Sequence, residues 1–204
     1  MPSRFPRVLT LPLAALLTGA AAAAPQTKPI QGVDVCTVTG TSGQYSVRVL
    51  NTGDKTLSHA DVLGVLLNSS GQGGKHVTVS LQNLPPGRYK TADLARHGES
   101  AALVSVATYQ MINGVDTPQY ELYAGKVAHV APGSALQYTL APLALRGWTV
   151  AYGAAQAPRL EAGNAVLLIY PARPDKKRDL TRPDAGRTPA DVVPLTACPG
   201  ARQP

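Results

Sequence analysis

Four histidines are the residues of this chain best suited to chemistry, because an imidazole can act as a general base or bind a metal ion. They are spread along the sequence at His59, His76, His97 and His129. No two of them stand two residues apart, as on one strand face, or four apart, as on one helix face, and local metal sites use those spacings. The spacing therefore predicts neither a metal site nor a bound cofactor.

Motifs that activate a nucleophile or cradle a phosphate are missing from the sequence. It contains no Gly-x-Ser-x-Gly and no His-Glu-x-x-His. Residues Gly71–Lys75 (GQGGK) are rich in glycine, but no Ser or Thr follows the lysine, so the segment is typical of a hairpin loop. Two carboxylates can hydrolyse a glycoside as acid and base, yet no spacing forces two of these six together: Asp61, Asp93, Glu99, Asp116, Glu121 and Glu161. We predict that the chain is not an enzyme.

Two cysteines stand near the two ends of the predicted mature chain, Cys36 near its start and Cys198 near its end. In an oxidising compartment a single pair leaves no thiol over, which favours a disulfide between them; two unpaired thiols are the alternative. The bridge would tie the C-terminal tail to the first predicted strand. In the chain-entropy model, closing so long a loop stabilises the fold by about 5 kcal/mol.

Aromatic side chains provide a candidate binding surface. Tyr and Trp combine a flat apolar face with a polar tip, which suits stacking on sugars and contacts with proteins. Five such residues are candidates for one shared surface: Tyr109, Tyr120, Tyr123, Trp148 and Tyr152. The alternative is that Trp148 and several tyrosines fill the core in place of phenylalanine.

Residues 1–24 have the pattern of a signal peptide. Arg4 and Arg7 form a positive region, Val8–Leu17 is apolar, and Ala20–Ala24 supply the small side chains that signal peptidase requires. The apolar run is shorter than the ~20 residues of a membrane-spanning helix. We therefore predict an exported protein (periplasmic, at the cell surface or secreted), with no transmembrane segment in the mature chain and with residues 25–32 as a short linker.

The positive charge is concentrated at the C-terminus. The formal net charge is +7, and residues 25–170 hold 10 basic and 8 acidic groups, against 7 and 4 in residues 171–204. Residues 171–204, here called the basic tail, are rich in proline and charge, and this composition predicts that residues 172 to about 189 are flexible. The candidate electrostatic residues are Arg173, Lys176, Lys177, Arg178 and Arg182. They would contact anionic envelope polymers, or else form a solvated tail. A nearly neutral body excludes nucleic acid as the expected partner.

Alternating apolar residues predict the strands that must position these groups. The pattern occurs at residues 45–49 and 77–81, with a continuous apolar run at 62–67 between them. Asn113-Gly114 is the strongest hairpin signal, because a type I′ turn needs positive φ at both positions. Later runs continue the pattern at 101–109, 120–122, 126–130, 136–140 and 164–170. We predict an all-β fold over residues 33–170, as one sandwich or as two small β-units that divide near residues 95–100.

The segments Val47–Asp54 (VRVLNTGD), Val77-Thr78-Val79 and Leu84–Gly87 (LPPG), with the strand from Val62, resemble the bacterial cell-adhesion-related modules called CARDB and similar immunoglobulin-like repeats. Those modules have an Asn-x-Gly turn after the first strand and a Leu-x-Pro-Gly turn before a later one. The resemblance covers residues 45–94. It implies an immunoglobulin-like β-sandwich with extended loops, used for display or adhesion, and it transfers no catalytic residues.

We therefore predict an exported, non-enzymatic module for cell-envelope binding, adhesion or structure, whose partner is an envelope protein or polysaccharide. The alternative is a carbohydrate-binding protein or a small envelope glycan hydrolase that uses the Tyr and Trp surface. A third hypothesis is an assembly role, in which an exposed sheet edge accepts a strand from a partner.

Overall fold

The chain is built from β-strands throughout the part that the structure describes. The computed structural model describes residues 32–40, 44–129, 136–140, 149–152, 165–173, 189 and 191–199, and for 128–129, 136–140 and 149–152 it describes the backbone alone. The strands in chain order are β1 (Val33–Thr39), β2 (Tyr45–Asn51), β3 (Leu57–Leu67), β4 (Gly73–Leu84), β5 (Tyr89–Asp93), β6 (Ser100–Ile112), β7 (Val115–His129), β8 (Leu136–Leu140), β9 (Thr149–Tyr152), β10 (Ala165–Pro171) and β11 (Asp191–Pro194). The predicted all-β class is confirmed. The predicted signal peptide, residues 1–24, lies outside the described residues.

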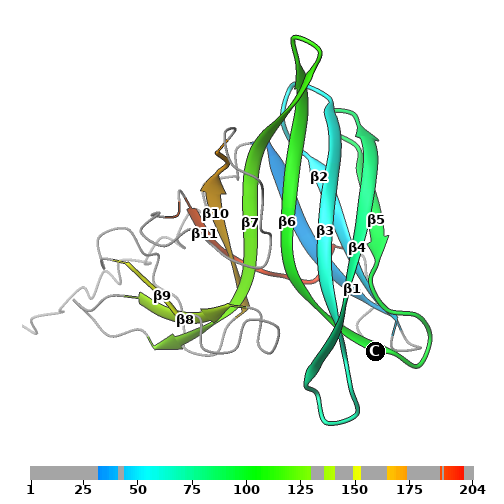
Figure 1. Cartoon of the computed structure of the whole chain (residues 1–204), viewed down its shortest axis with the longest axis vertical. Coiled ribbons are helices and arrows are strands. Elements are labelled where there is room, and N and C mark those ends of the chain that lie inside the picture. Colours follow the sequence, from blue (N-terminus) through cyan, green and yellow to red (C-terminus); the bar gives the residue numbers. More distant parts are fainter. Residues whose placement is uncertain are drawn as a thin grey trace, which may run out of the picture.

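The strands form two sheets that pack face to face (Figure 1). The small sheet has the order β1-β2-β5, and the large sheet has the order β11-β10-β7-β6-β3-β4, with β8 beside β7 and β9 beside β8. Apolar side chains fill the space between the sheets, because alternate residues of a strand point to the same face. The core consists of Val33, Val35, Val47, Val49, Leu57, Ala60, Val62, Leu81, Leu84, Ala92, Leu94, Leu103, Val106, Leu122, Ala124, Leu167 and Ile169. The fold is a β-sandwich.

Strands from both sides of residues 95–100 share the large sheet. β3 pairs with β6 in a register that runs from His59 opposite Tyr109 to Leu67 opposite Ser100. The connection before β6 is held to the small sheet, where the N–H groups of Leu94 and Ala95 both donate to the carbonyl of Tyr45. The described strands therefore form one sandwich and do not divide into two β-units near residues 95–100.

The turn predicted at Asn113-Gly114 joins β6 to β7. Asn113 has a φ of 51° and Gly114 a φ of 77°. Both values lie in the left-handed region, which Asn and Gly adopt more easily than other residues. The hairpin prediction is confirmed.

Asn51, at the end of β2, holds two turns of the sandwich together. Its side chain is fully buried, and its Nδ2 donates to the carbonyls of Lys55 and Leu84, both at 2.8 Å. Its Oδ1 accepts the N–H of Gly53 at 3.0 Å. Its backbone carbonyl accepts the N–H of Gly87 at 2.8 Å. The Asn-x-Gly turn and the Pro-Gly turn therefore meet at one residue.

Residues 191–198, here called the C-terminal strap, close one side of the sandwich. The first half of the strap is β11, which pairs with β10 at the edge of the large sheet. The second half runs beside β1, where the N–H of Thr37 donates to the carbonyl of Thr196 at 3.0 Å and the N–H of Cys198 donates to the carbonyl of Thr37 at 2.9 Å. Figure 1 shows the strap, in red, passing from β11 to β1. One segment thus joins the edges of both sheets.

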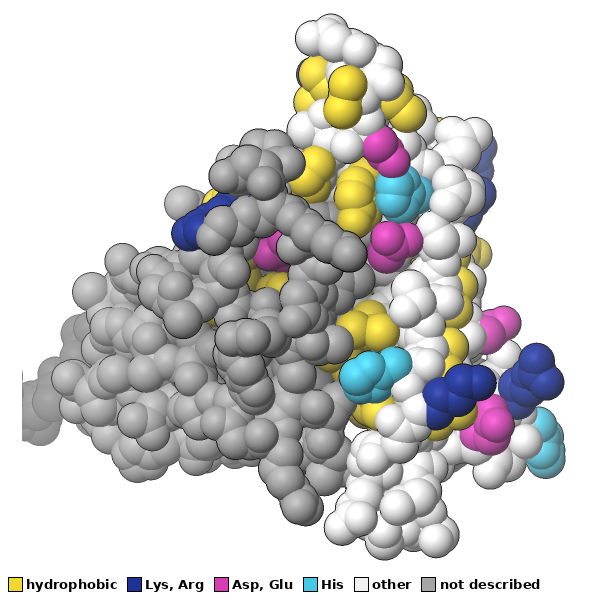
Figure 2. Space-filling view, viewed as in Figure 1, with side chains coloured by type: hydrophobic (Ala, Val, Ile, Leu, Met, Phe, Trp, Pro, Cys, Tyr) yellow, Lys and Arg dark blue, Asp and Glu magenta, His cyan; other side chains and the backbone are white. Residues whose placement is uncertain are grey.

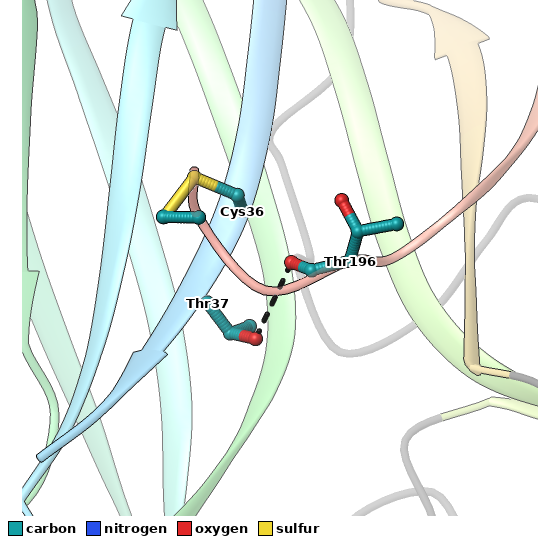
Figure 3. Close-up of a disulfide and its surroundings, with 4 residues drawn as sticks. Cys36, Thr37 and Thr196 are labelled. Atoms are coloured by element: carbon teal, nitrogen blue, oxygen red, sulfur yellow. Dashed lines mark hydrogen bonds between the residues drawn. A yellow bond between two sulfur atoms is a disulfide. The ribbon is translucent and has the colours of Figure 1, made fainter. Parts of the chain in front are cut away.

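A disulfide locks the strap in place. Cys36 of β1 and Cys198 are bonded, with a Cα–Cα distance of 4.9 Å, which confirms the predicted bridge (Figure 3). The strap contains apolar residues that the sandwich uses: Val192 is buried, and Val193 and Leu195 pack against the core. These contacts account for the strand at residues 191–194, which follows the segment 172–189 that was predicted to be flexible. Residues 174–188 of the basic tail lie outside the described residues.

Candidate functional site

A histidine flanked by two aspartates lies on the outer face of the large sheet. Nδ1 of His59 is 3.0 Å from Oδ2 of Asp116, and Nε2 is 3.8 Å from Oδ2 of Asp61. The imidazole stacks on the ring of Tyr109, with ring centroids 3.9 Å apart and an interplanar angle of 16°. The hydroxyl of Ser58 donates to Oδ1 of Asp116. We call these five residues the His59 cluster.

Three strands bring the His59 cluster together. Ala60 and Val62 of β3 point into the core, so the alternating residues His59 and Asp61 point to the opposite face. The β3–β6 register places His59 opposite Tyr109, and Asp116 is the second residue of β7. Figure 2 shows a histidine on this face with acidic side chains above and below it. Antiparallel pairing therefore assembles residues that are far apart in the sequence.

The geometry of the His59 cluster does not match the serine–histidine pair of a serine hydrolase. A catalytic serine must hydrogen-bond to the imidazole that takes its proton, whereas Ser58 donates to Asp116. Carboxylates of the same chain lie beside both ring nitrogens of His59, Asp116 at 3.0 Å from Nδ1 and Asp61 at 3.8 Å from Nε2. One metal ion cannot reach both edges of the ring, and the described residues contain no group of three potential metal ligands. The cluster instead ties the start of β7 to β3.

The hairpin above this cluster presents apolar side chains to solvent. Met111, Ile112 and Val115, which we call the apolar tip, are 59%, 43% and 64% exposed. They flank the turn between β6 and β7. Figure 1 shows this hairpin, in green, projecting beyond its neighbours, and Figure 2 shows hydrophobic side chains at its end. Large apolar residues grouped on an exposed surface are typical of a contact site.

The His59 cluster supports the apolar tip from below. Asp116 directly follows Val115, and its carboxylate contacts Ser58 and His59 of β3. The hydroxyl of Thr117 donates to the carbonyl of Val115 at 3.1 Å. A hairpin held in this way loses less conformational freedom when its tip binds a partner.

The three residues of the predicted aromatic surface whose side chains the structure describes do not form one exposed surface. Tyr123 is 1% exposed, and its ring packs edge to face on that of Tyr170 with centroids 5.7 Å apart, so it is buried in the described structure. Tyr120 packs against the sandwich core, whereas Tyr109 lies on the outer face with His59. The alternation of strand side chains places Tyr120 and Tyr123 on opposite faces of β7, and Tyr123 is covered on its own face by contacts that include Tyr170.

Other predicted site residues are placed only in part. Arg173 follows β10 and is exposed. For Tyr152 the structure describes the backbone and not the side chain. The remaining candidates lie outside the described residues: Trp148, Lys176, Lys177, Arg178 and Arg182. The aromatic and electrostatic predictions for these residues stay predictions.

Sequence reasoning missed the His59 cluster and the apolar tip. The cluster depends on the pairing of β3 with β6, which alternation alone does not reveal. The tip had a local signal, because apolar residues stand on both sides of the predicted Asn113-Gly114 turn. In a two-residue hairpin such residues have little structure around them to bury their side chains.

Comparisons with models of protein families, with curated proteins and with solved structures find no match for this chain. The resemblance of residues 45–94 to CARDB and immunoglobulin-like modules therefore stays a prediction. Among the described residues, no helix has the length and apolar character needed to cross a membrane. The Cys36–Cys198 disulfide is typical of proteins in an oxidising compartment.

Proposed function

We propose that this chain is an exported, non-enzymatic module of the cell envelope, on an immunoglobulin-like scaffold, that binds a partner protein through the apolar tip. The exposure of Met111, Ile112 and Val115 on a braced hairpin is the observation that supports this proposal. About half of each side chain is still open to water, so burial against a partner would contribute roughly 1 kcal/mol for each. Interfaces gain most of their affinity from a few such anchors.

The charges near the tip favour a protein partner over a lipid surface. Residues 109–118 carry a single charged side chain, that of Asp116. Anionic membranes attract surfaces rich in Lys and Arg, which this hairpin lacks. The surface that fits is an apolar pocket on another envelope protein, with a neutral or basic rim facing Asp116.

The same geometry supports a binding role over catalysis. The contacts of the His59 cluster are directed within the protein, and their effect is to hold β7 against β3. A carbohydrate site built on the predicted aromatic surface would require different residues, because Tyr123 is buried and Tyr120 faces the core.

Site-specific photo-crosslinking in the envelope of the producing cell tests this function. A crosslinker at Met111 is expected to capture a defined protein, and the substitutions Ile112→Ser and Val115→Ser on the same chain are expected to abolish the adduct. Gln72 is the matched control site, because it is exposed in the β3–β4 turn at the opposite end of the sandwich. Equal adducts from positions 111 and 72, no protein adduct at 111, or adducts with lipid alone would contradict the proposal.

A further inference from the structure

β4 is the last strand of the large sheet, and it has a neighbour on one side only among the described strands. It pairs with β3 over a strand of 12 residues. The side chains of His76, Thr78 and Ser80 are exposed, while Val77 and Val79 are half-buried. An edge strand of this length presents unpaired N–H and C=O groups that another strand can bind.

One contact shows which residues of β4 direct their backbone groups outward. Nζ of Lys90, on β5, donates to the carbonyl of Gln82. In an antiparallel strand the N–H and C=O of one residue point to the same side, and the side alternates along the chain. Gln82, Ser80, Thr78 and His76 therefore direct their backbone groups to the open edge, and the residues between them bond to β3.

Both ends of this edge are protected, and the middle is open. At one end the β3–β4 register shifts between Val65 and Leu67, opposite the start of β4. At the other end Lys90 occupies the carbonyl of Gln82. Bulges and lysines are the devices with which proteins block edge pairing. Residues 76–81, here called the open window, contain neither a proline nor a charged side chain directed at the core.

We propose that the open window pairs antiparallel with the open window of a second copy of this chain, with Thr78 on the two-fold axis. In this register Thr78 lies opposite Thr78 of the second copy, Val77 opposite Val79, and His76 opposite Ser80. Residues that lie opposite each other in this register point to the same face of the joined sheet. The half-buried valines therefore extend both cores, and the polar residues remain on the outer face. The carbonyl of Gln82 stays with Lys90.

The side chains of the open window select a second copy as the occupant. The strand that fits this edge must alternate apolar and short polar residues, and VTVSL at residues 77–81 has that pattern. Thr–Thr pairs and β-branched pairs across strands are favourable. No like charges meet, because Lys75 lies opposite Leu81 of the second copy. A two-fold axis also makes the contact closed and self-complementary.

The dimer is independent of the apolar tip, because the two surfaces lie on different strands. Its consequence for binding is that one assembly carries two apolar tips, which raises the effective affinity for a surface with repeated partners. Failure of one proposal leaves the other intact.

Sedimentation velocity of the full exported chain, over a range of concentrations, tests the assembly. The wild type is expected to be a dimer. Thr78→Pro removes an N–H that points to the open edge, which edge strands tolerate, so it is expected to yield a folded monomer with a Tm close to that of the wild type. Val79→Pro is the control for strand orientation: it removes an N–H bonded to β3 and is expected to lower the Tm. A wild type that is monomeric throughout, or a dimer that survives Thr78→Pro, would overturn the proposal.

Oxidative crosslinking tests the register. Thr78→Cys places two thiols opposite each other on the axis, at a Cα separation of about 5.5 Å that suits a disulfide. Ser80→Cys is the matched control, because each thiol lies about four residues, or ~14 Å, from its counterpart. A covalent dimer from Thr78→Cys alone supports the register, and crosslinking of Ser80→Cys in its place would overturn it.

Discussion

Replacing Asn51 by alanine is expected to destabilise the sandwich far more than replacing Asn68. Each asparagine makes three side-chain hydrogen bonds, but Asn51 is fully buried and Asn68 is exposed. Asn51→Ala removes three bonds, at about 1 kcal/mol each, and leaves the buried carbonyl of Leu84 without that partner, at about 1–2 kcal/mol more. The expected loss is about 4 kcal/mol. For Asn68→Ala, water replaces the lost partners and the loss is about 1 kcal/mol or less.

Urea unfolding followed by tryptophan fluorescence and circular dichroism measures this difference. With a slope of about 2 kcal/mol per molar urea, Asn51→Ala lowers the midpoint by about 2 M and Asn68→Ala by about 0.5 M or less. Asn51→Asp sharpens the test, since its carboxylate would face the carbonyls of Lys55 and Leu84, which are both acceptors. That variant is expected to lose at least as much stability as Asn51→Ala at neutral pH. Equal midpoint shifts for the alanine variants at positions 51 and 68 would refute the argument from burial.

Three further predictions concern pH, the disulfide and packing. Burial raises the pKa of the Tyr45 hydroxyl above its ordinary value of 10.0, against a smaller opposing effect from a hydrogen bond with the backbone of Leu103. The folded state therefore holds the Tyr45 proton more tightly than the unfolded state does, and the stabilisation from this difference is complete below pH 10 and is lost as the pH rises through the folded-state pKa. The urea midpoint of Tyr45→Phe should fall less than that of the wild type between pH 9 and 11. Parallel curves for the two proteins would contradict this. Replacing both Cys36 and Cys198 by serine should lower the free energy of unfolding by about 5 kcal/mol, which is the chain-entropy value for a sequence separation of 162 residues. Reduction of the wild type should have the same effect in urea titrations. An unchanged urea midpoint would disprove this prediction. A Cβ on Gly64 would lie 2.7 Å from Cδ1 of Leu94, so Gly64→Ala should lower the free energy of unfolding by about 1–3 kcal/mol. The loss should be smaller when Leu94 is also replaced by alanine, because the clash is then removed. An equal loss with and without Leu94→Ala would show that this contact is not the cause.

Local patterns in the sequence correctly located several elements of this fold. The alternation of Val47 and Val49 with polar neighbours marks β2, and both valines are fully buried. Asn113-Gly114 marks the hairpin, because the backbone of these two residues tolerates positive φ. The odd separation of Tyr120 and Tyr123 on one strand also contained a local signal, and it argued against the aromatic surface that was predicted from composition.

The strap contains a strand that the composition of the tail did not indicate. Residues 171–204 are rich in proline and charge, yet the short segment Asp191–Leu195 supplies apolar side chains to an edge of the sandwich. Average composition over the tail conceals a strand of four residues. The disulfide and the pairing with β10 provide the stabilisation that the segment lacks by itself.

The sequence by itself determined the β class, the positions of most strands and the hairpin turn, and it favoured the pairing of the two cysteines. These follow from steric and hydrogen-bonding preferences that act over a few residues, or from the fact that two cysteines allow a single pair. Only the tertiary structure decided that β3 lies beside β6, that His59 meets Asp116 beneath the apolar tip, and that β4 is left at an edge. Strand order depends on which arrangement buries the whole set of apolar faces at once, and no local pattern encodes that choice.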